Sequence, residues 1–280
     1  MANLYSTLAP QPSPKCKYAQ SFTKLRVSPL RYHGSALLIG AILLTFSLSD
    51  CTRKPNAQTI IEAAITTHGG ARYTSSVIEF DFRHQHYTVQ RHGGLFTYKR
   101  IFRDSTGIVE DVLNNEAFHR EINGEKIPLS EKVKSSLSSS LNSVVYFALL
   151  PYGLNDPAVQ KRYLGEASIK GQPYNKVEVT FRQEGGGKDY QDSFVYWIHK
   201  SRHTMDYLAY RFHVDGGGTR FRQAINPRTV GGIRFSDYFN YKGLSRDLNI
   251  AEYGRLFEAG QVTKVSDIIL ENVRVKSLSD

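Results

Sequence analysis

Apolar and polar residues alternate with a period of two through much of the chain after residue 76, which predicts β-strands. In the first of these stretches Ile78, Phe80 and Phe82 alternate with acidic residues. The apolar phase then shifts, so we expect a bend or bulge near residues 84–86. Turns rich in glycine and asparagine separate the stretches, and consecutive strands joined by tight turns predict an antiparallel sheet.

Several of the later strands are apolar on both faces. Tyr196 lies on one side of its strand, whereas Val195 and Trp197 lie on the other. Helices packed on one side of a sheet cover only one face, so the second apolar face must pack against protein or line a cavity. We expect these strands at residues 167–169, 175–182, 193–199, 204–214, 219–226, 232–242 and 264–275.

Helical periodicity is confined to two segments. Residues 59–68 form the shorter one, which ends at a Gly-Gly pair, and residues 130–150 form the longer one, which is followed by Pro151. We expect the longer helix to lie across the open side of a curved sheet as a lid, with Tyr146 and Phe147 reaching a cavity. Its apolar stripe consists of Val133, Leu137, Leu141, Val144 and Ala148.

The N-terminal segment predicts export. An uncharged apolar run at residues 36–46 follows several basic residues, as in a signal peptide, and is too short to span a bilayer. We therefore expect residues 1–50 to be a signal peptide. Because the positive charges begin far from Met1, we also expect the true start to lie downstream, near Leu25 or Val27.

Cys51 is the expected site of lipidation. Leu48 and Ser49 resemble the lipobox of bacterial lipoproteins, whereas Asp50 departs from the usual small residue at that position. The alternative is a free thiol after a hydrophobic helix. With lipidation, residues 51–56 are a lipidated tether, residues 57–280 form a single β-rich domain, and no disulfide is available because Cys16 is the only other cysteine.

The charge of the chain favours a membrane surface over nucleic acid as a partner. The formal net charge is +10 and falls to about +6 without residues 1–50, which hold five basic residues and one acidic residue. A moderately basic domain on a lipid anchor is attracted weakly to anionic head groups. The basic residues are scattered along the sequence, so we expect no nucleic-acid partner.

No motif predicts an enzyme, a cofactor or a metal site. His84 and His86 have a spacing that can present two imidazoles to a metal, but no third ligand stands at a motif spacing. The Gly185-Gly186-Gly187-Lys188 turn lacks the wider phosphate-loop pattern and joins two strands. The nucleophile motif GxSxG is missing from the sequence, and SxxK is missing after the expected signal peptide.

Aromatic residues crowd the later strands, which indicates either an ordinary β-core or a wide apolar pocket. For the pocket, the candidate lining residues are Tyr146, Phe147, Tyr196, Trp197, Tyr210, Phe212, Phe235 and Phe239.

Residues 174–210 resemble the middle of the outer-membrane lipoprotein-sorting proteins of the LolA and LolB type. The matching positions are Val177, Val179, Phe181, Trp197 and Ile198. A closer likeness, over residues 56–275, is to uncharacterised lipoproteins of Gram-negative bacteria that share the segments GGGTRFRQAINPR and GIRFSDYFNY. The resemblance implies a mostly β (α+β) fold, in which a curved antiparallel sheet forms an incomplete β-barrel closed by helices over an apolar cavity.

Together these patterns predict a membrane-anchored lipoprotein that binds an acyl chain or another apolar ligand in the concave face of the half-barrel, in lipid or lipoprotein handling. The expected location is the cell envelope, at the outer membrane facing the periplasm. One alternative is a structural or interaction lipoprotein with a packed core and no ligand, and a third is an enzyme of unknown type.

Overall fold

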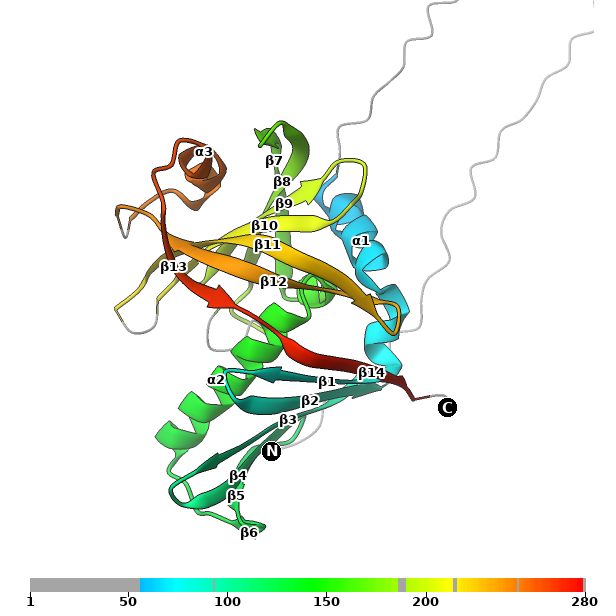
Figure 1. Cartoon of the computed structure of the whole chain (residues 1–280), viewed down its shortest axis with the longest axis vertical. Helices are drawn as coiled ribbons and strands as arrows, with labels where there is room; N and C mark the ends of the chain where they lie inside the picture. Colours follow the sequence, from blue (N-terminus) through cyan, green and yellow to red (C-terminus); the bar gives the residue numbers. More distant parts are fainter. Residues whose placement is uncertain (1–55, 93, 186–189, 214–215, 246, 279–280) are drawn as a thin grey trace, which may run out of the picture. The chain divides into compact units, whose positions relative to one another are not determined.

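Two antiparallel sheets of seven strands each make up most of the structure (Figure 1). The computed structural model describes residues 56–278 apart from residues 93, 186–189, 214–215 and 246. The predicted signal peptide and Cys51 therefore lie outside the described residues. The prediction of a mostly β, antiparallel and incompletely closed fold with few helices is confirmed.

The first sheet is a meander extended by the C-terminal strand, in the order β14-β1-β2-β3-β4-β5-β6. Its strands are β1 (Ser76–Phe82), β2 (Gln85–His92), β3 (Leu95–Asp104), β4 (Gly107–Asn114), β5 (Phe118–Ile122), β6 (Glu125–Lys126) and β14 (Glu271–Ser277).

The second sheet is also a meander, in the order β13-β12-β11-β10-β9-β8-β7. Its strands are β7 (Val159–Ile169), β8 (Gln172–Phe181), β9 (Ser193–His199), β10 (Met205–Phe212), β11 (Gly218–Val230), β12 (Ile233–Lys242) and β13 (Thr263–Ile268).

The chain crosses from one sheet to the other between β13 and β14. The single strand expected at residues 264–275 is wrong, because residues 269 and 270 separate two strands that belong to different sheets. The Leu270 amide donates to the buried carboxylate of Asp237 at 2.9 Å, and the Leu270 carbonyl accepts from Arg228 at 2.5 Å. Arg228 also donates to Asp237 at 3.1 Å, so one ion pair binds both the amide and the carbonyl of Leu270.

The bend or bulge expected near residues 84–86 is a tight hairpin turn. Phe82 pairs with Gln85, so Arg83 and His84 form a two-residue loop, with φ angles of 50° and 62°. A turn with positive φ at both central residues matches the twist of the flanking strands, but it usually contains asparagine and glycine. The sequence lacks that signal, and the phase shift resembled a bulge instead.

Among the described residues, three α-helices and three short 3-10 helices accompany the two sheets. Helix α1 begins after Asn56, whose side chain accepts from the Gln58 amide at 3.0 Å, and it ends at Gly69 with φ 144°. Helix α2 begins after Ser130, whose hydroxyl accepts from the Val133 amide at 3.4 Å. The helices are α1 (Ala57–His68), α2 (Glu131–Ala148), α3 (Tyr253–Glu258), η1 (Gly70–Thr74), η2 (Tyr152–Asn155) and η3 (Ile250–Glu252).

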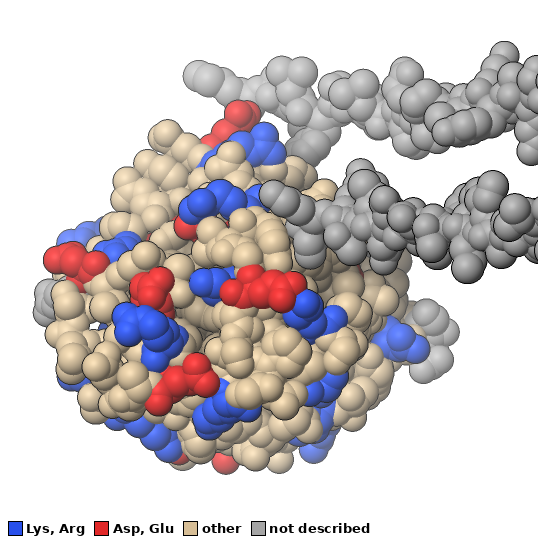
Figure 2. Space-filling model, turned by 90° about the horizontal axis from the view of Figure 1, so that it is seen from above, with Lys and Arg blue, Asp and Glu red and all other residues tan. Residues whose placement is uncertain are grey.

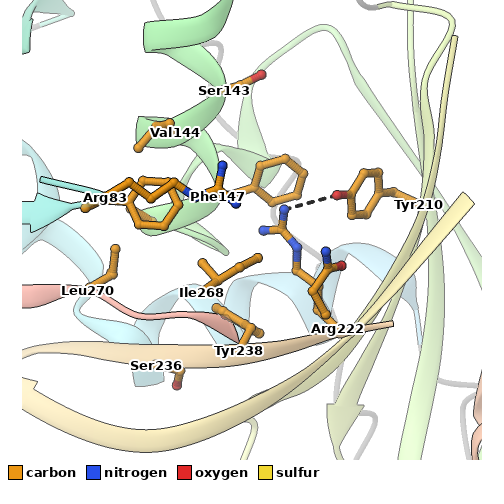
Figure 3. Close-up of a pocket in the computed structure, with 13 residues that line it drawn as sticks. Arg83, Ser143, Val144, Phe147, Tyr210, Arg222, Ser236, Tyr238, Ile268 and Leu270 are labelled. Atoms are coloured by element: carbon orange, nitrogen blue, oxygen red, sulfur yellow. Dashed lines mark hydrogen bonds between the residues drawn. The ribbon is translucent and has the colours of Figure 1, made fainter. Parts of the chain in front are cut away.

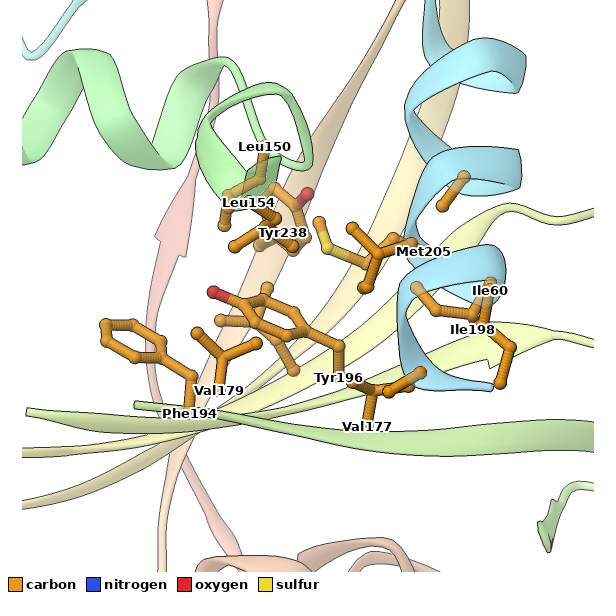
Figure 4. Close-up of a cluster of buried hydrophobic side chains, with 14 residues drawn as sticks. Ile60, Leu150, Leu154, Val177, Val179, Phe194, Tyr196, Ile198, Met205 and Tyr238 are labelled. Carbon is orange, nitrogen blue, oxygen red and sulfur yellow. The ribbon is translucent and has the colours of Figure 1, made fainter. Parts of the chain in front are cut away.

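The buried side chains form three clusters. We call the face of the second sheet toward α1 its inner face; there the first cluster holds Ile61 and Tyr196 (Figure 4). The second cluster lies between α2 and the first sheet and includes Leu141. The third covers the outer face of the second sheet under η3 and α3, where Trp197 and Tyr253 are fully buried.

These clusters and all described elements lie within residues 52–280, which form one compact unit. A unit that contains its own hydrophobic cores has what it needs to fold alone. Experiments on residues 52–280 therefore address the complete β-domain.

Candidate ligand-binding site

A pocket of about 290 Å³ lies where the C-terminal half of α2 meets the inner face of the second sheet (Figure 3). Helix α2 forms one wall, strands β10 to β12 form the opposite wall, and the link between β13 and β14 closes one side. The lining residues are Phe82, Arg83, Ser143, Val144, Phe147, Ala148, Tyr210, Arg222, Ser236, Tyr238, Asn240, Ile268 and Leu270.

Helix α2 separates this pocket from the core of the first sheet. Phe147 and Ala148 follow Val144 by three and four residues, so both lie on its side of the helix, which lines the pocket. Leu141 and Val145, on an adjacent face, are fully buried in the second cluster. The helix is thus a core element as far as Val145, and only its last turns border the pocket.

Val133 does not pack with the rest of the expected apolar stripe. Its side chain is 42% exposed at the first turn of α2, so the stripe that packs begins at Leu137.

Arg222 supplies a buried cation at the sheet wall. It lies on β11, is 8% exposed, and donates from Nη2 to the Tyr210 hydroxyl at 3.0 Å. Its guanidinium carbon lies 3.9 Å from the centre of the Phe147 ring, in cation–π geometry. Its Nε is buried without a hydrogen-bond partner among the described residues.

Tyr238 lines the pocket, and two further tyrosines with neutral hydroxyls, Tyr146 and Tyr196, lie in or against the first cluster. Burial raises the pKa of Tyr238 to about 12, against a weaker opposing effect of Arg222. Burial also raises the pKa of Tyr146 and of Tyr196, whose hydroxyls contact each other at 3.0 Å. These groups can donate and accept hydrogen bonds without carrying charge near neutral pH.

Two further polar atoms of lining residues are buried without a partner among the described residues, namely Ser236 Oγ and Asn240 Oδ1. The Asn240 amide donates from its other end to Ser266 Oγ at 3.1 Å. The lining contains two arginines and no aspartate or glutamate. The pocket thus combines apolar walls with polar and basic groups.

The structure brings four of the sequence-derived candidates together. Phe147 and Tyr210 line the pocket, with their rings 5.0 Å apart. Tyr146 lies next to Phe147, at 5.5 Å between ring centres, and hydrogen-bonds to Tyr196 in the first cluster.

The other four candidates lie elsewhere. Trp197 packs against Phe221 on the outer face of the second sheet, because successive residues of a strand point to opposite faces. Phe235 is buried in the second cluster, and Phe212 lines a separate pocket of about 730 Å³. Phe239 lies under the Lys264 ammonium at 3.8 Å.

Arg222 and Arg83 were not predicted as pocket residues, because the candidates were chosen for their aromatic side chains. Strand alternation could have identified Arg222. It lies two residues before Ala224, which packs on the first cluster, and residues two apart on a strand share a face, so both face inward. Arg83 lines the pocket through the tight β1–β2 turn, which the sequence did not indicate.

The two histidines considered for a metal do not converge. His84 lies exposed in the β1–β2 turn, and His86 pairs with Asp81 at 2.7 Å. In the part of the chain that the structure describes, no three His, Cys, Asp or Glu side chains are grouped as for a metal ion. Within the same residues no helix combines the length and apolar character needed to cross a bilayer.

Basic and acidic side chains are interspersed on the face of the molecule seen in Figure 2. On this face the charges form short mixed groups separated by uncharged surface.

The comparisons with known proteins found similar structures and one family. A LolA superfamily protein from Nitrosomonas europaea is 13% identical, over 80% of this chain and 95% of that chain, with a TM-score of 0.46. A putative outer membrane lipoprotein-sorting protein domain from Vibrio parahaemolyticus is 10% identical, over 79% and 94%, with a TM-score of 0.41. A DUF1329 family protein from Desulfovibrio piger is 14% identical, over 78% and 92%, with a TM-score of 0.40.

The predicted resemblance to lipoprotein-sorting proteins is confirmed among these structures. The search of curated proteins found no match. A family model described as "Family of unknown function (DUF6503)" matches residues 37–269, which is most of the chain. The chain therefore belongs to the DUF6503 family, a family of unknown function.

Proposed function

We propose that the protein is a lipid-anchored lipoprotein of the cell envelope whose β-domain binds a single acyl chain, or an apolar ligand of similar width. The observation that carries the proposal is the pocket between α2 and the inner face of the second sheet. Its volume of about 290 Å³ is near the lower end of the range for small-molecule sites, about 300–1,000 Å³. That size favours one chain over a lipid with two or three chains.

The apolar walls give such a ligand its main driving force. Val144, Phe147, Ile268 and Leu270 supply aliphatic and aromatic surface on both sides of the pocket. Each buried methylene contributes about 0.8 kcal/mol. Affinity should therefore rise with chain length until the pocket is filled and then level off.

The pocket is tested by titrating residues 52–280 with saturated fatty acids and alcohols of increasing length. Val144→Phe should fill the pocket and weaken binding at least tenfold. Val133→Phe is the matched control, since Val133 lies on the same helix but is 42% exposed and does not line the pocket. A wild-type domain that binds none of these chains would refute the proposal.

The lipid anchor is a separate part of the proposal and rests on the sequence around Cys51. An attached diacyl group with an additional amide-linked chain makes membrane attachment stable, because each buried methylene contributes about 0.8 kcal/mol. Detergent partitioning of the full chain should move Cys51→Ser to the aqueous phase while Cys16→Ser stays with the detergent. Equal partitioning of both variants with the detergent would refute lipidation of Cys51.

A structural lipoprotein without a ligand is the second candidate, and the first cluster favours it. Ile61, Tyr196 and Leu208 are fully buried, so side chains fill the inner face beneath α1. This candidate predicts that no chain binds and that Val144→Phe changes stability only.

A further inference from the structure

Arg222 differs from the other deeply buried arginine of the described residues in having no anionic partner. Arg100, which is 6% exposed, donates to the Asp111 carboxylate at 2.5 and 3.0 Å and to Ser140 Oγ at 3.1 Å. Arg222 is 8% exposed, and its one described hydrogen bond goes to the neutral hydroxyl of Tyr210. Its charge is thus buried without a carboxylate to neutralise it.

A buried, unpaired charge is costly, since the protein interior replaces the hydration of an ion poorly. The Phe147 ring offsets part of this cost from one side of the guanidinium. It does not use the N–H groups, which lie in the guanidinium plane, and Nε remains without a partner. An anion within the pocket would both satisfy these donors and neutralise the charge.

The rest of the lining also favours an anion. No carboxylate lines the pocket, and Arg83 extends from the β1–β2 turn toward Phe147 on the side away from Arg222 (Figure 3). Tyr238, a neutral hydroxyl, lines the same sheet wall as Arg222. The local charge of the lining is therefore positive.

We propose that the ligand of this pocket is a single-chain amphiphile with a carboxylate head group, as in a free fatty acid, and that Arg222 binds the carboxylate. This inference rests on the proposed function. The planar guanidinium fork matches the two oxygens of a carboxylate, and the volume of about 290 Å³ suits one chain. From Arg222 the tail passes Ile268 toward Leu270, along the apolar wall of the pocket (Figure 3).

The test compares three ligands of equal chain length on residues 52–280: dodecanoate, its methyl ester and 1-dodecanol. The wild-type domain should bind the carboxylate about 10- to 100-fold more tightly than the two neutral ligands, which corresponds to about 1.4–2.7 kcal/mol. In Arg222→Met this ratio should fall to about one while alcohol binding is retained. Arg220→Met is the matched control and should keep the wild-type ratio, because Arg220 lies two residues away on β11 and lines a different pocket.

The possible results distinguish a failure of the carboxylate assignment from a failure of the proposed function. If no ligand binds the wild-type domain, the proposed function itself fails, and the inference with it. If all three ligands bind the wild-type domain equally, the pocket binds chains but the carboxylate assignment is overturned. A preference that survives in Arg222→Met would also overturn the role of Arg222.

A folding defect in Arg222→Met is handled with a second variant. Arg222→Lys keeps the charge but loses the planar fork, so it should retain a smaller preference for the carboxylate over the alcohol. Urea unfolding of each variant identifies those that remain folded. Equal binding of carboxylate and alcohol by a folded Arg222→Lys domain would count against the assignment, as would a preference equal to that of the wild type.

Discussion

Truncation of Leu141 measures how strongly helix α2 packs against the first sheet. The Leu141 side chain is fully buried in the second cluster, between α2 and the first sheet. Truncation to alanine leaves a cavity there, and such truncations cost about 2–5 kcal/mol. In a domain of this size, each 1 kcal/mol lowers the midpoint of thermal unfolding by about 2–4 °C, so we expect Leu141→Ala to lower it by roughly 4–20 °C.

The assay is urea unfolding of residues 52–280, with Val133→Ala as the control on the same helix. Val133 is 42% exposed, so its truncation should change the free energy of unfolding by less than about 0.5 kcal/mol. The slope of free energy against urea should stay the same in both variants, because the surface exposed on unfolding is unchanged. If Leu141→Ala costs no more than about 1 kcal/mol, α2 is a loosely held lid and its packing against the first sheet is refuted.

Two further predictions concern buried polar groups. Asp111 is fully buried and Arg100 depends on it, so Asp111→Ala should destabilise the domain by about 3–5 kcal/mol in urea unfolding. Glu110→Ala, on a partly exposed pair with Lys99, should cost less than about 1 kcal/mol, and equal losses would contradict this. Burial lowers the pKa of His68 from 6.5 to about 4, so its neutral form stabilises the fold above pH 6.5, and roughly 3 kcal/mol of that stability is lost as the pH falls toward 4. His68→Gln should flatten the pH profile of unfolding between pH 4 and 6.5 relative to wild type, and an unchanged profile would refute the assignment.

Alternation along the strands was sufficient to predict antiparallel strands, but not their division into two sheets or the roles of the two faces. Tyr196 and Trp197 are adjacent aromatic residues and both are fully buried, yet Tyr196 lies in the first cluster on the inner face and Trp197 lies in the third cluster under α3. The sequence correctly indicated that the second apolar face must be covered or must line a cavity. The second apolar face of the sheet is covered by η3 and α3, two short helices near residue 250. Their weak helical periodicity did not allow them to be predicted from the sequence.

The candidate site was predicted less completely, for reasons of long-range geometry. Phe147 and Tyr210 come together because α2 ends against the second sheet, and no local pattern encodes that contact. Arg222 is a charged residue at an inward-facing strand position, a violation of the usual pattern of the kind expected at functional or strained sites.

The two residues between β13 and β14 also form a joint about which the two sheets can rotate. They connect edge strands of the two sheets, while Ile268 and Leu270 form a side of the pocket. A rotation of one sheet against the other about this link would change the width of the pocket, and it would also shift the packing of the second cluster, which holds residues of both sheets. The ion pair of Arg228 and Asp237 stiffens that joint, because it binds both the amide and the carbonyl of Leu270. The backbone of Leu270 therefore ties one side of the pocket to a buried ion pair of the second sheet.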